Sequence, residues 1–183
     1  MNRKSWYRKK YDREVIQSRF VAPGPFPYVL VLDHLKAGWN VGKILRSANA
    51  LGCREVHLVN VGPFDPSPAK GALRHTRTRL FTSLPESLAS LLSEGYSLYS
   101  LDPEGRGRLY ETPLPAKSAF IFGHEEFGLS FTADERPEVT GLRIEQFGRV
   151  QSLNVSVAAS IVAYEYLRQR NFANEVSNGP SDS

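Results

Sequence analysis

The chain has 183 residues, of which 41% are hydrophobic and 23% charged, and its formal net charge is +4. These values are typical of a single compact domain with a real core. Its one cysteine, Cys53, excludes a disulfide framework, a structural zinc cluster and a Cys-x-x-Cys redox pair, and the four histidines lack zinc-site spacing. No apolar run reaches the roughly 18 residues of a membrane helix, and the amino terminus does not resemble a secretory signal. The sequence therefore predicts a cytoplasmic protein without a membrane segment or a metal.

The excess positive charge lies in the first 20 residues, which hold seven Lys or Arg against two acids. Trp6, Tyr7 and Tyr11 alternate with these basic residues, and cations beside aromatic rings suit single-stranded or looped RNA. A solvated tail that only aids solubility explains this segment equally well. Residues 1–27 are thus predicted to be a basic arm that ends in a proline-rich linker.

A second basic cluster, over residues 70–79, favours a polyanionic partner. It holds four positive charges within ten residues and no acid. Each phosphate contact would steepen the salt dependence of binding by roughly one log unit per log unit of salt. The candidate RNA-binding residues of the two clusters are Arg3, Lys4, Arg8, Lys9, Lys10, Lys70, Arg74, Arg77 and Arg79.

Apolar runs and helical patterns alternate along the rest of the chain. Buried strands are predicted over 28–32, 56–61, 97–101, 118–122 and 142–144. Helices are predicted over 40–51, 83–95 and 154–170. Asn40 is a candidate N-cap of the first helix and Gly52 a candidate stop, while Arg46 lies opposite the apolar face. This alternation predicts an α/β domain with a mainly parallel sheet flanked by helices over 28–170, followed by a disordered tail over 171–183.

Three segments that follow predicted strands are rich in glycine and polar residues: 33–42, 122–128 and 146–154. Ligands bind beyond the carboxyl ends of the strands in open parallel sheets, so these segments are candidates for one shared site. The chain contains no Gly-x-Gly-x-x-Gly, P-loop or Gly-x-Ser-x-Gly string. A dinucleotide fold, a P-loop nucleotide site and a serine-hydrolase elbow are therefore not supported.

Taken singly, the polar residues of these segments have ordinary explanations. Asn40 alone is more often a helix cap, and Arg46 on an exposed helical face is usually a solvated charge. Glu125 in a turn is usually a surface residue, and Ser152 and Asn154 could merely cap the last helix. These explanations do not account for all of them occurring in one ordered pattern.

Together, the three segments resemble the three signature motifs of the SpoU/TrmH family, the RNA 2′-O-ribose methyltransferases of the SPOUT superfamily. The resemblance spans about residues 28–170, and its most specific part is the string SLNVSVAA. The matching residues are Asn40, Arg46, Gly123, Glu125, Gly128, Ile144, Gly148 and the run from Ser152 to Ala159.

The resemblance implies a SPOUT-type α/β knot, in which the carboxy-terminal segment threads a loop to form a deep trefoil. It implies S-adenosylmethionine as the cofactor, bent into the knot and held largely by backbone groups. It also implies a homodimer. The residues expected to bind the cofactor are Leu101, Gly123, Gly128, Ile144, Gly148 and Leu153.

The resemblance also implies the roles of five catalytic residues. Arg46 of one subunit would complete a site of the pair, and because arginine stays protonated we expect it to grip the adjacent phosphate and stabilise the developing alkoxide. Asn40 and Asn154 would position Arg46 and the ribose. Glu125 would anchor the group, and Ser152 would donate near the phosphate or the cofactor.

One position departs from the family pattern: Glu145 and Gln146 follow Ile144, where the family usually has Pro and then Met or a similar residue. A carboxylate beside the adenine would change the polarity of the pocket and bear on cofactor affinity. The sequence predicts an S-adenosylmethionine-dependent RNA ribose methyltransferase, with tRNA favoured over rRNA by the short basic arm. The alternatives are a knotted RNA-binding module without catalysis and a base methyltransferase of the same fold.

Overall fold

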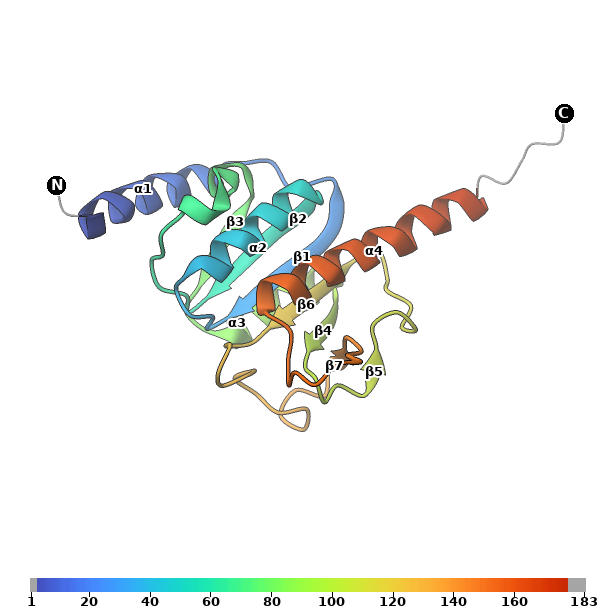
Figure 1. The fold of residues 1–183 in the computed structure, drawn as a ribbon. Helices are drawn as coiled ribbons and strands as arrows, with labels where there is room; N and C mark the ends of the chain where they lie inside the picture. Colours follow the sequence, from blue (N-terminus) through green and yellow to red (C-terminus); the bar gives the residue numbers. More distant parts are fainter. Residues whose placement is uncertain (1–2, 178–183) are drawn as a thin grey trace, which may run out of the picture.

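The computed structural model describes residues 3–177, and the side chains of residues 6–170 (Figure 1). The helices are α1 (Arg3–Ser18), α2 (Trp39–Ala50), α3 (Leu84–Ser93) and α4 (Val155–Ser177), and the 3₁₀ turns are η1 (Ser67–Ala69) and η2 (Ala72–His75). The strands are β1 (Phe26–Asp33), β2 (Cys53–Val59), β3 (Thr78–Phe81), β4 (Ser97–Leu101), β5 (Gly107–Arg108), β6 (Ser118–Phe122) and β7 (Val139–Arg143). None of the helices within residues 3–177 is long and apolar enough to cross a membrane.

Across the described residues, seven strands form one sheet in the order β3-β2-β1-β6-β4-β7-β5. Every pairing in it is parallel, which confirms the predicted sheet type. Parallel neighbours require crossover connections, and all of their carboxyl ends meet at one edge. This edge is where the three glycine-rich segments begin.

The alternation of side chains along β1 builds the two apolar layers of the domain. Tyr28, Leu30 and Leu32 belong to one cluster, which also contains buried residues of α1, α2 and α4. Val29 and Val31 belong to the other cluster, which contains buried residues of α3. Three helices therefore cover one face of the sheet and α3 covers the other (Figure 1).

All predicted strands and helices are present, with bounds shifted by a few residues. The prediction that Asn40 caps α2 is wrong, because the helix begins at Trp39 with Gly38 as its N-cap. Gly52 follows the helix with φ +65°, a conformation that favours glycine, as predicted. α4 continues to Ser177, beyond its predicted end, and residues 178–183 of the predicted tail lie outside the described residues.

The basic arm forms the helix α1. Tyr11 and Val15 lie one turn apart and are buried, and the Tyr11 ring contacts Phe64 edge-on at 5.0 Å between centroids. Tyr11 is therefore unavailable for stacking on RNA bases, contrary to the prediction. α1 also packs against η2, which brings the two basic clusters together.

A buried polar row joins β2 to α3. Glu55 Oε1 lies 2.9 Å from His57 Nε2, and His57 Nδ1 lies 2.8 Å from Ser87 Oγ. Arg77 and Arg79 from the second basic cluster also bind the Glu55 carboxylate, at 3.0 and 3.3 Å. Arg79 also pairs with Glu94 at 3.6 Å, so two of the four positive charges in that cluster are matched by two carboxylates within the fold.

We expect Glu55→Gln to destabilise the protein at neutral pH. Burial alone raises the pKa of Glu55, but His57 and Arg79 outweigh it and lower the pKa from 4.5 to about 2. A carboxyl whose pKa is lower in the folded state stabilises the fold above its unfolded value, and this contribution is lost as pH falls toward the folded value. The variant should lose up to about 3 kcal/mol of unfolding free energy at pH 7.

Denaturant unfolding of both proteins between pH 7 and pH 3 measures this effect. The difference in unfolding free energy should shrink as the pH falls below 4.5. Asp134→Asn, a change at an exposed residue, is the control and should behave like the wild type. A Glu55→Gln protein with the wild-type pH dependence would contradict the assignment.

Candidate active site

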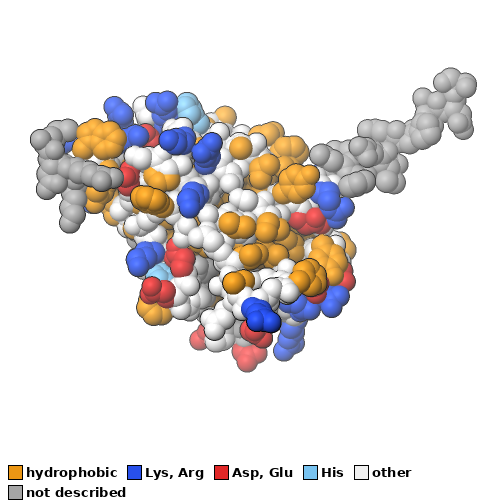
Figure 2. Space-filling model, viewed as in Figure 1, with side chains coloured by type: hydrophobic (Ala, Val, Ile, Leu, Met, Phe, Trp, Pro, Cys, Tyr) orange, Lys and Arg blue, Asp and Glu red, His pale blue; other side chains and the backbone are white. Residues whose placement is uncertain are grey.

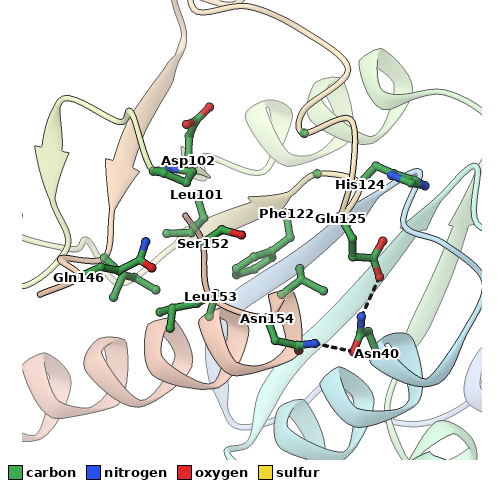
Figure 3. A pocket seen from close by; sticks show the side chains of 16 residues that line it. Asn40, Leu101, Asp102, Phe122, His124, Glu125, Gln146, Ser152, Leu153 and Asn154 are labelled. Atoms are coloured by element: carbon green, nitrogen blue, oxygen red, sulfur yellow. Dashed lines mark hydrogen bonds between the residues drawn. The ribbon is translucent and has the colours of Figure 1, made fainter. Parts of the chain in front are cut away.

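A cavity of about 480 Å³ opens at the carboxyl edge of the sheet, between the loops that follow β4, β6 and β7 and the start of α4 (Figure 3). Its volume lies within the roughly 300–1,000 Å³ of small-molecule sites. Gln146 and Leu153 lie at one side of this cavity, and Glu125 and Asn40 lie at the other (Figure 3). The cavity thus has a polar side built from side chains of separate segments.

Three side chains at the polar side form one hydrogen-bonded row. Asn154 Nδ2 donates to Asn40 Oδ1 at 3.2 Å, and Asn40 Nδ2 donates to Glu125 Oε1 at 2.8 Å. The backbone N–H and the hydroxyl of Ser156 both donate to Asn154 Oδ1, at 2.9 and 2.6 Å, so Asn154 caps α4. Because the cap uses this oxygen, Asn154 presents its N–H to Asn40, and Asn40 in turn presents its N–H to Glu125.

The second carboxylate oxygen of Glu125 accepts a hydrogen bond from the backbone N–H of Lys36 at 3.1 Å. Partial burial raises the pKa of Glu125, but the hydrogen bonds from Asn40 and Lys36 outweigh it and hold the pKa below its ordinary value. Glu125 is therefore a carboxylate at neutral pH, and it anchors the row as an acceptor.

Close backbone contacts hold the loop that carries Glu125. A Cβ on Gly123 would lie 2.3 Å from the carbonyl carbon of Gly128, so only glycine fits there. His124 and Gly128 exchange two backbone hydrogen bonds, at 2.7 and 2.9 Å. Asp33, buried at the end of β1, accepts a hydrogen bond from Ser130 N at 3.0 Å. The loop is thus tied to itself and to β1, which fixes the direction of Glu125.

Two acidic residues, Asp102 and Glu125, are among the described residues that line the cavity, and no Lys or Arg is. A cavity lined by charges of one sign raises the local concentration of ligands of opposite charge. This lining favours a ligand that carries positive charge.

The comparison with protein families decides the identity of this fold. The model of the SpoU rRNA methylase family matches residues 27–164. The chain belongs to this family.

Two curated relatives illustrate the similarity of the sequence. The chain is 34% identical over 158 residues to the 23S rRNA (guanosine-2′-O-)-methyltransferase RlmB of Neisseria meningitidis, covering 81% of this chain and 61% of the relative. It is 31% identical over 146 residues to the tRNA (guanosine(18)-2′-O)-methyltransferase of Thermus thermophilus, covering 77% and 74%. The chain spans about three fifths of the length of the RlmB relatives that it matches.

Solved structures have the same fold. A structure described as giving insight into the 2-OH methylation of C/U34 on tRNA matches with a TM-score of 0.70 and 29% identity, over 81% of this chain and 99% of that one. The SpoU methyltransferase AviRb of Streptomyces viridochromogenes, in complex with AdoMet, matches with a TM-score of 0.71 and 23% identity, over 81% and 62%.

Most residues that the SpoU family motifs single out lie together in this chain. The predicted catalytic and cofactor-binding residues that line the cavity are Asn40, Leu101, Gly123, Glu125, Gly128, Ile144, Ser152, Leu153 and Asn154. Gly148 is not in the lining and is exposed, with open space around it. Arg46 is not in the lining either: it lies on the exposed face of α2, roughly 9 Å along the helix axis from Asn40.

The two residues that depart from the family pattern lie on opposite sides of the backbone. Glu145 is outside the cavity lining, where Arg108 Nε binds it at 2.7 Å and the Tyr110 hydroxyl donates to it at 3.1 Å. Gln146 lines the cavity. The expectation of a Glu145 carboxylate inside the pocket is therefore wrong, and its charge is matched by arginine instead.

Sequence reasoning missed three parts of the site. Lys36 contributes through its backbone N–H, which no side-chain pattern reveals. Phe122 and Asp102 line the cavity because they end or follow the strands β6 and β4. Their position at the carboxyl ends of strands is the one sequence signal that could have indicated them.

Two substitutions of Asn154 separate its cap from its place in the row. Asn154→Ala loses both, and we expect it to lower the unfolding free energy by about 1 kcal/mol. Asn154→Asp keeps an acceptor for Ser156 and adds a favourable charge at a helix N-terminus, so its stability should stay near that of the wild type. It cannot donate to Asn40, however, which breaks the row.

Denaturant unfolding measures the stability of both variants. The pKa of Glu125, followed by carboxyl NMR, should rise in Asn154→Asp, because a new negative charge lies next to Asn40, which binds Glu125. If Asn154→Asp were as unstable as Asn154→Ala, the cap would not be what Asn154 supplies.

Proposed function

We propose that this chain transfers a methyl group from S-adenosylmethionine to a ribose 2′-hydroxyl of structured RNA in the cytoplasm, with tRNA favoured over rRNA. The observation that carries the proposal is the Glu125–Asn40–Asn154 row, which joins all three family motifs at one cavity. Mass spectrometry of nucleosides from RNA treated with the protein tests it. A 2′-O-methylated ribose is the expected product, and a methylated base or an unmodified RNA would contradict it.

The cavity fits the proposed cofactor. Its two carboxylates suit a sulfonium cation, and its apolar residues Leu101, Ile144 and Leu153 suit a purine ring. The carboxamide oxygen of Gln146 is buried in this lining without a hydrogen-bond partner among the described residues, so the cavity offers an acceptor to a ligand. The arginine contacts of Glu145 hold its carboxylate outside the lining, so the departure from the family pattern at Glu145 does not count against cofactor binding.

The cofactor would supply an already activated methyl group, so the residues of the chain have to orient the ribose hydroxyl and help it lose its proton. Asn40 and Asn154 have a fixed donor direction and would hold the ribose in line. Glu125 would keep Asn40 in place, and Ser152, in the cavity lining, would donate to the phosphate or the cofactor. Arg46, permanently charged, would bind the adjacent phosphate and stabilise negative charge on the 2′-oxygen.

The position of Arg46 favours a homodimer. It faces solvent on α2 and makes no ion pair or hydrogen bond among the residues described, so it is available to a site on another subunit. Next to it, Val157, Ile161 and Tyr164 expose one apolar face of α4 and line a shallow groove with Lys43 of α2 (Figure 2). We infer that this face of α4 packs against a second copy of the chain.

The path of the carboxy-terminal segment supports the predicted trefoil knot. After β7 the chain passes the loops that follow β4 and β6, all three of which line the cavity, before α4 packs on α2. The loop after β4 wraps β7 closely: a Cβ on Gly105 would lie 2.5 Å from the carbonyl carbon of Leu142. An experimental structure traced from residue 101 to residue 158 tests the threading.

The RNA surface that we propose combines α1 with the turns η1 and η2, where Lys and Arg side chains gather (Figure 2). Arg8 and Lys10 pair with acids on α1, and Arg77 and Arg79 pair with Glu55, which reduces their net charge. The side chains of Arg3 and Lys4 lie outside the described part. Lys9, Lys70 and Arg74 make no ion pair with an acid within that part, so they would contribute most to phosphate binding.

The action of Arg46 across the dimer can be tested by mixing two defective subunits. Arg46→Ala alone should abolish RNA methylation and leave cofactor binding intact, while Leu153→Trp, which fills the cavity, should abolish both. Co-expressed together, the two variants should recover about a quarter of wild-type activity, because about half of the dimers are mixed and each has one intact site.

The activity of the co-expressed mixture is the measurement, and mixed dimers purified by a different tag on each subunit should reach about half of wild-type activity because each has one intact site of two. A mixture as inactive as either variant would mean that Arg46 serves its own subunit. Full cofactor binding by Arg46→Ala, measured by calorimetry, controls for misfolding.

Neutralising unpaired and paired cations should affect RNA binding differently. Changing both Lys70 and Arg74 to Gln should lower the slope of log Kd against log salt by roughly 1 to 2 units. Arg77→Gln should change this slope little and reduce stability instead, since Arg77 binds Glu55. Fluorescence anisotropy with labelled tRNA between 50 and 300 mM salt measures the slopes, and equal slopes in the double variant and the wild type would exclude this surface.

A further inference from the structure

Gln146 presents an unused hydrogen-bonding group to the cavity. Its carboxamide oxygen is buried and has no partner among the described residues, although Gln146 lines the cavity. Buried polar groups in proteins are almost always paired, and an unpaired one costs stability. The missing partner is therefore expected to come with the ligand.

The backbone holds Gln146 in this direction. Just after β7 ends, Ile144 and Gln146 line the cavity while Glu145 between them does not, which is the alternation that a strand would continue. Arg108 and Tyr110 bind Glu145 on the outer side, and Arg143 adds a contact at 3.8 Å. These contacts hold Glu145 on the outer side and so keep the neighbouring Gln146 side chain directed toward the cavity.

The surroundings of Gln146 indicate what it binds. Leu101, Ile144, Leu153 and Ala158 line the same cavity with apolar surface, which suits the faces of a flat heteroaromatic ring. The Asn40–Glu125 row, where a ribose has to approach, lies across the cavity (Figure 3). A ligand that places its reactive group at the row would place its other end at Gln146.

We propose that the Gln146 side chain recognises the polar edge of the adenine ring of the cofactor. A glutamine carboxamide pairs with adenine by two hydrogen bonds, accepting one from the 6-amino group and donating one to a neighbouring ring nitrogen. Gln146 Oε1 accepts from the 6-amino group, and Gln146 Nε2 donates to the ring. The inference rests on the proposed function, and it makes Gln146 a specificity-determining residue at a position where the family pattern usually has Met or a similar residue.

The test compares two ligands by isothermal titration calorimetry with the full-length protein. The ligands are S-adenosylhomocysteine and its analogue in which hydrogen replaces the 6-amino group. The wild type should bind the analogue roughly tenfold more weakly, because Oε1 stays unpaired. Gln146→Met, close in shape but without the amide, should bind S-adenosylhomocysteine roughly tenfold more weakly than the wild type and distinguish the two ligands less than threefold.

Two further variants complete the design. Gln151→Leu alters an exposed glutamine outside the cavity lining and should keep the wild-type ratio of affinities. Gln146→Glu keeps the acceptor and should keep the preference for the 6-amino group, which tests the assignment if Gln146→Met does not fold.

The outcomes separate this inference from the proposed function. If the wild type fails to bind S-adenosylhomocysteine at millimolar concentration, the proposed cofactor is wrong, and the role proposed for Gln146 is then wrong as well. If the wild type binds it but Gln146→Met keeps the full wild-type ratio, the cofactor assignment stands and Gln146 does not recognise adenine. A ratio that falls in Gln146→Met and persists in Gln151→Leu supports the inference.

Discussion

The hydrogen bond from Asn40 to Glu125, extended by Asn154, is the interaction on which the site depends. It connects residues 85 positions apart, and the bond from Asn154 to Asn40 connects residues 114 apart. The cap of α4 sets the direction of every donor in the row. The geometry of the site therefore depends on where α4 starts. If the start of α4 moved, Asn154 and Asn40 would reorient and Glu125 would lose its hydrogen bond from Asn40.

The sequence allowed the sheet to be predicted because strands buried on both faces appear as continuous apolar runs. It did not reveal α1 or β3, since both contain basic residues whose environment depends on distant partners. Tyr11 and Val15 become apolar anchors only against residues such as Phe64. Arg77 precedes β3 and Arg79 lies within it because Glu55, on the neighbouring strand, binds both of them and Glu94 also binds Arg79.

The sequence predicted which residues form the site, but not which way each side chain points. The motifs brought Asn40, Glu125 and Asn154 to one cavity, and strand ends at a parallel edge explain why. Whether Glu145 or Gln146 enters the pocket depends on side-chain alternation and on the contact between Arg108 and Glu145. The sequence alone does not show that contact. Arg46 lies outside the cavity of its own chain, so the role proposed for it depends on a second subunit, and that role comes from the family resemblance rather than from residue spacing.

α2 separates the two kinds of ligand that the proposed reaction has to bring together. On its inner side Asn40 belongs to a cavity with two carboxylates, which favours a cation; on its outer side Arg46 is free to meet a phosphate. Lys70 and Arg74 belong to the turns that pack on the same helix. Under the proposed function, the outer side of α2 would therefore meet a phosphate of the RNA, and the inner side would hold the sulfonium. Since Arg46 is proposed to serve the other subunit, the positive side of α2 in one protomer and the acidic cavity of its partner would together form one complete site.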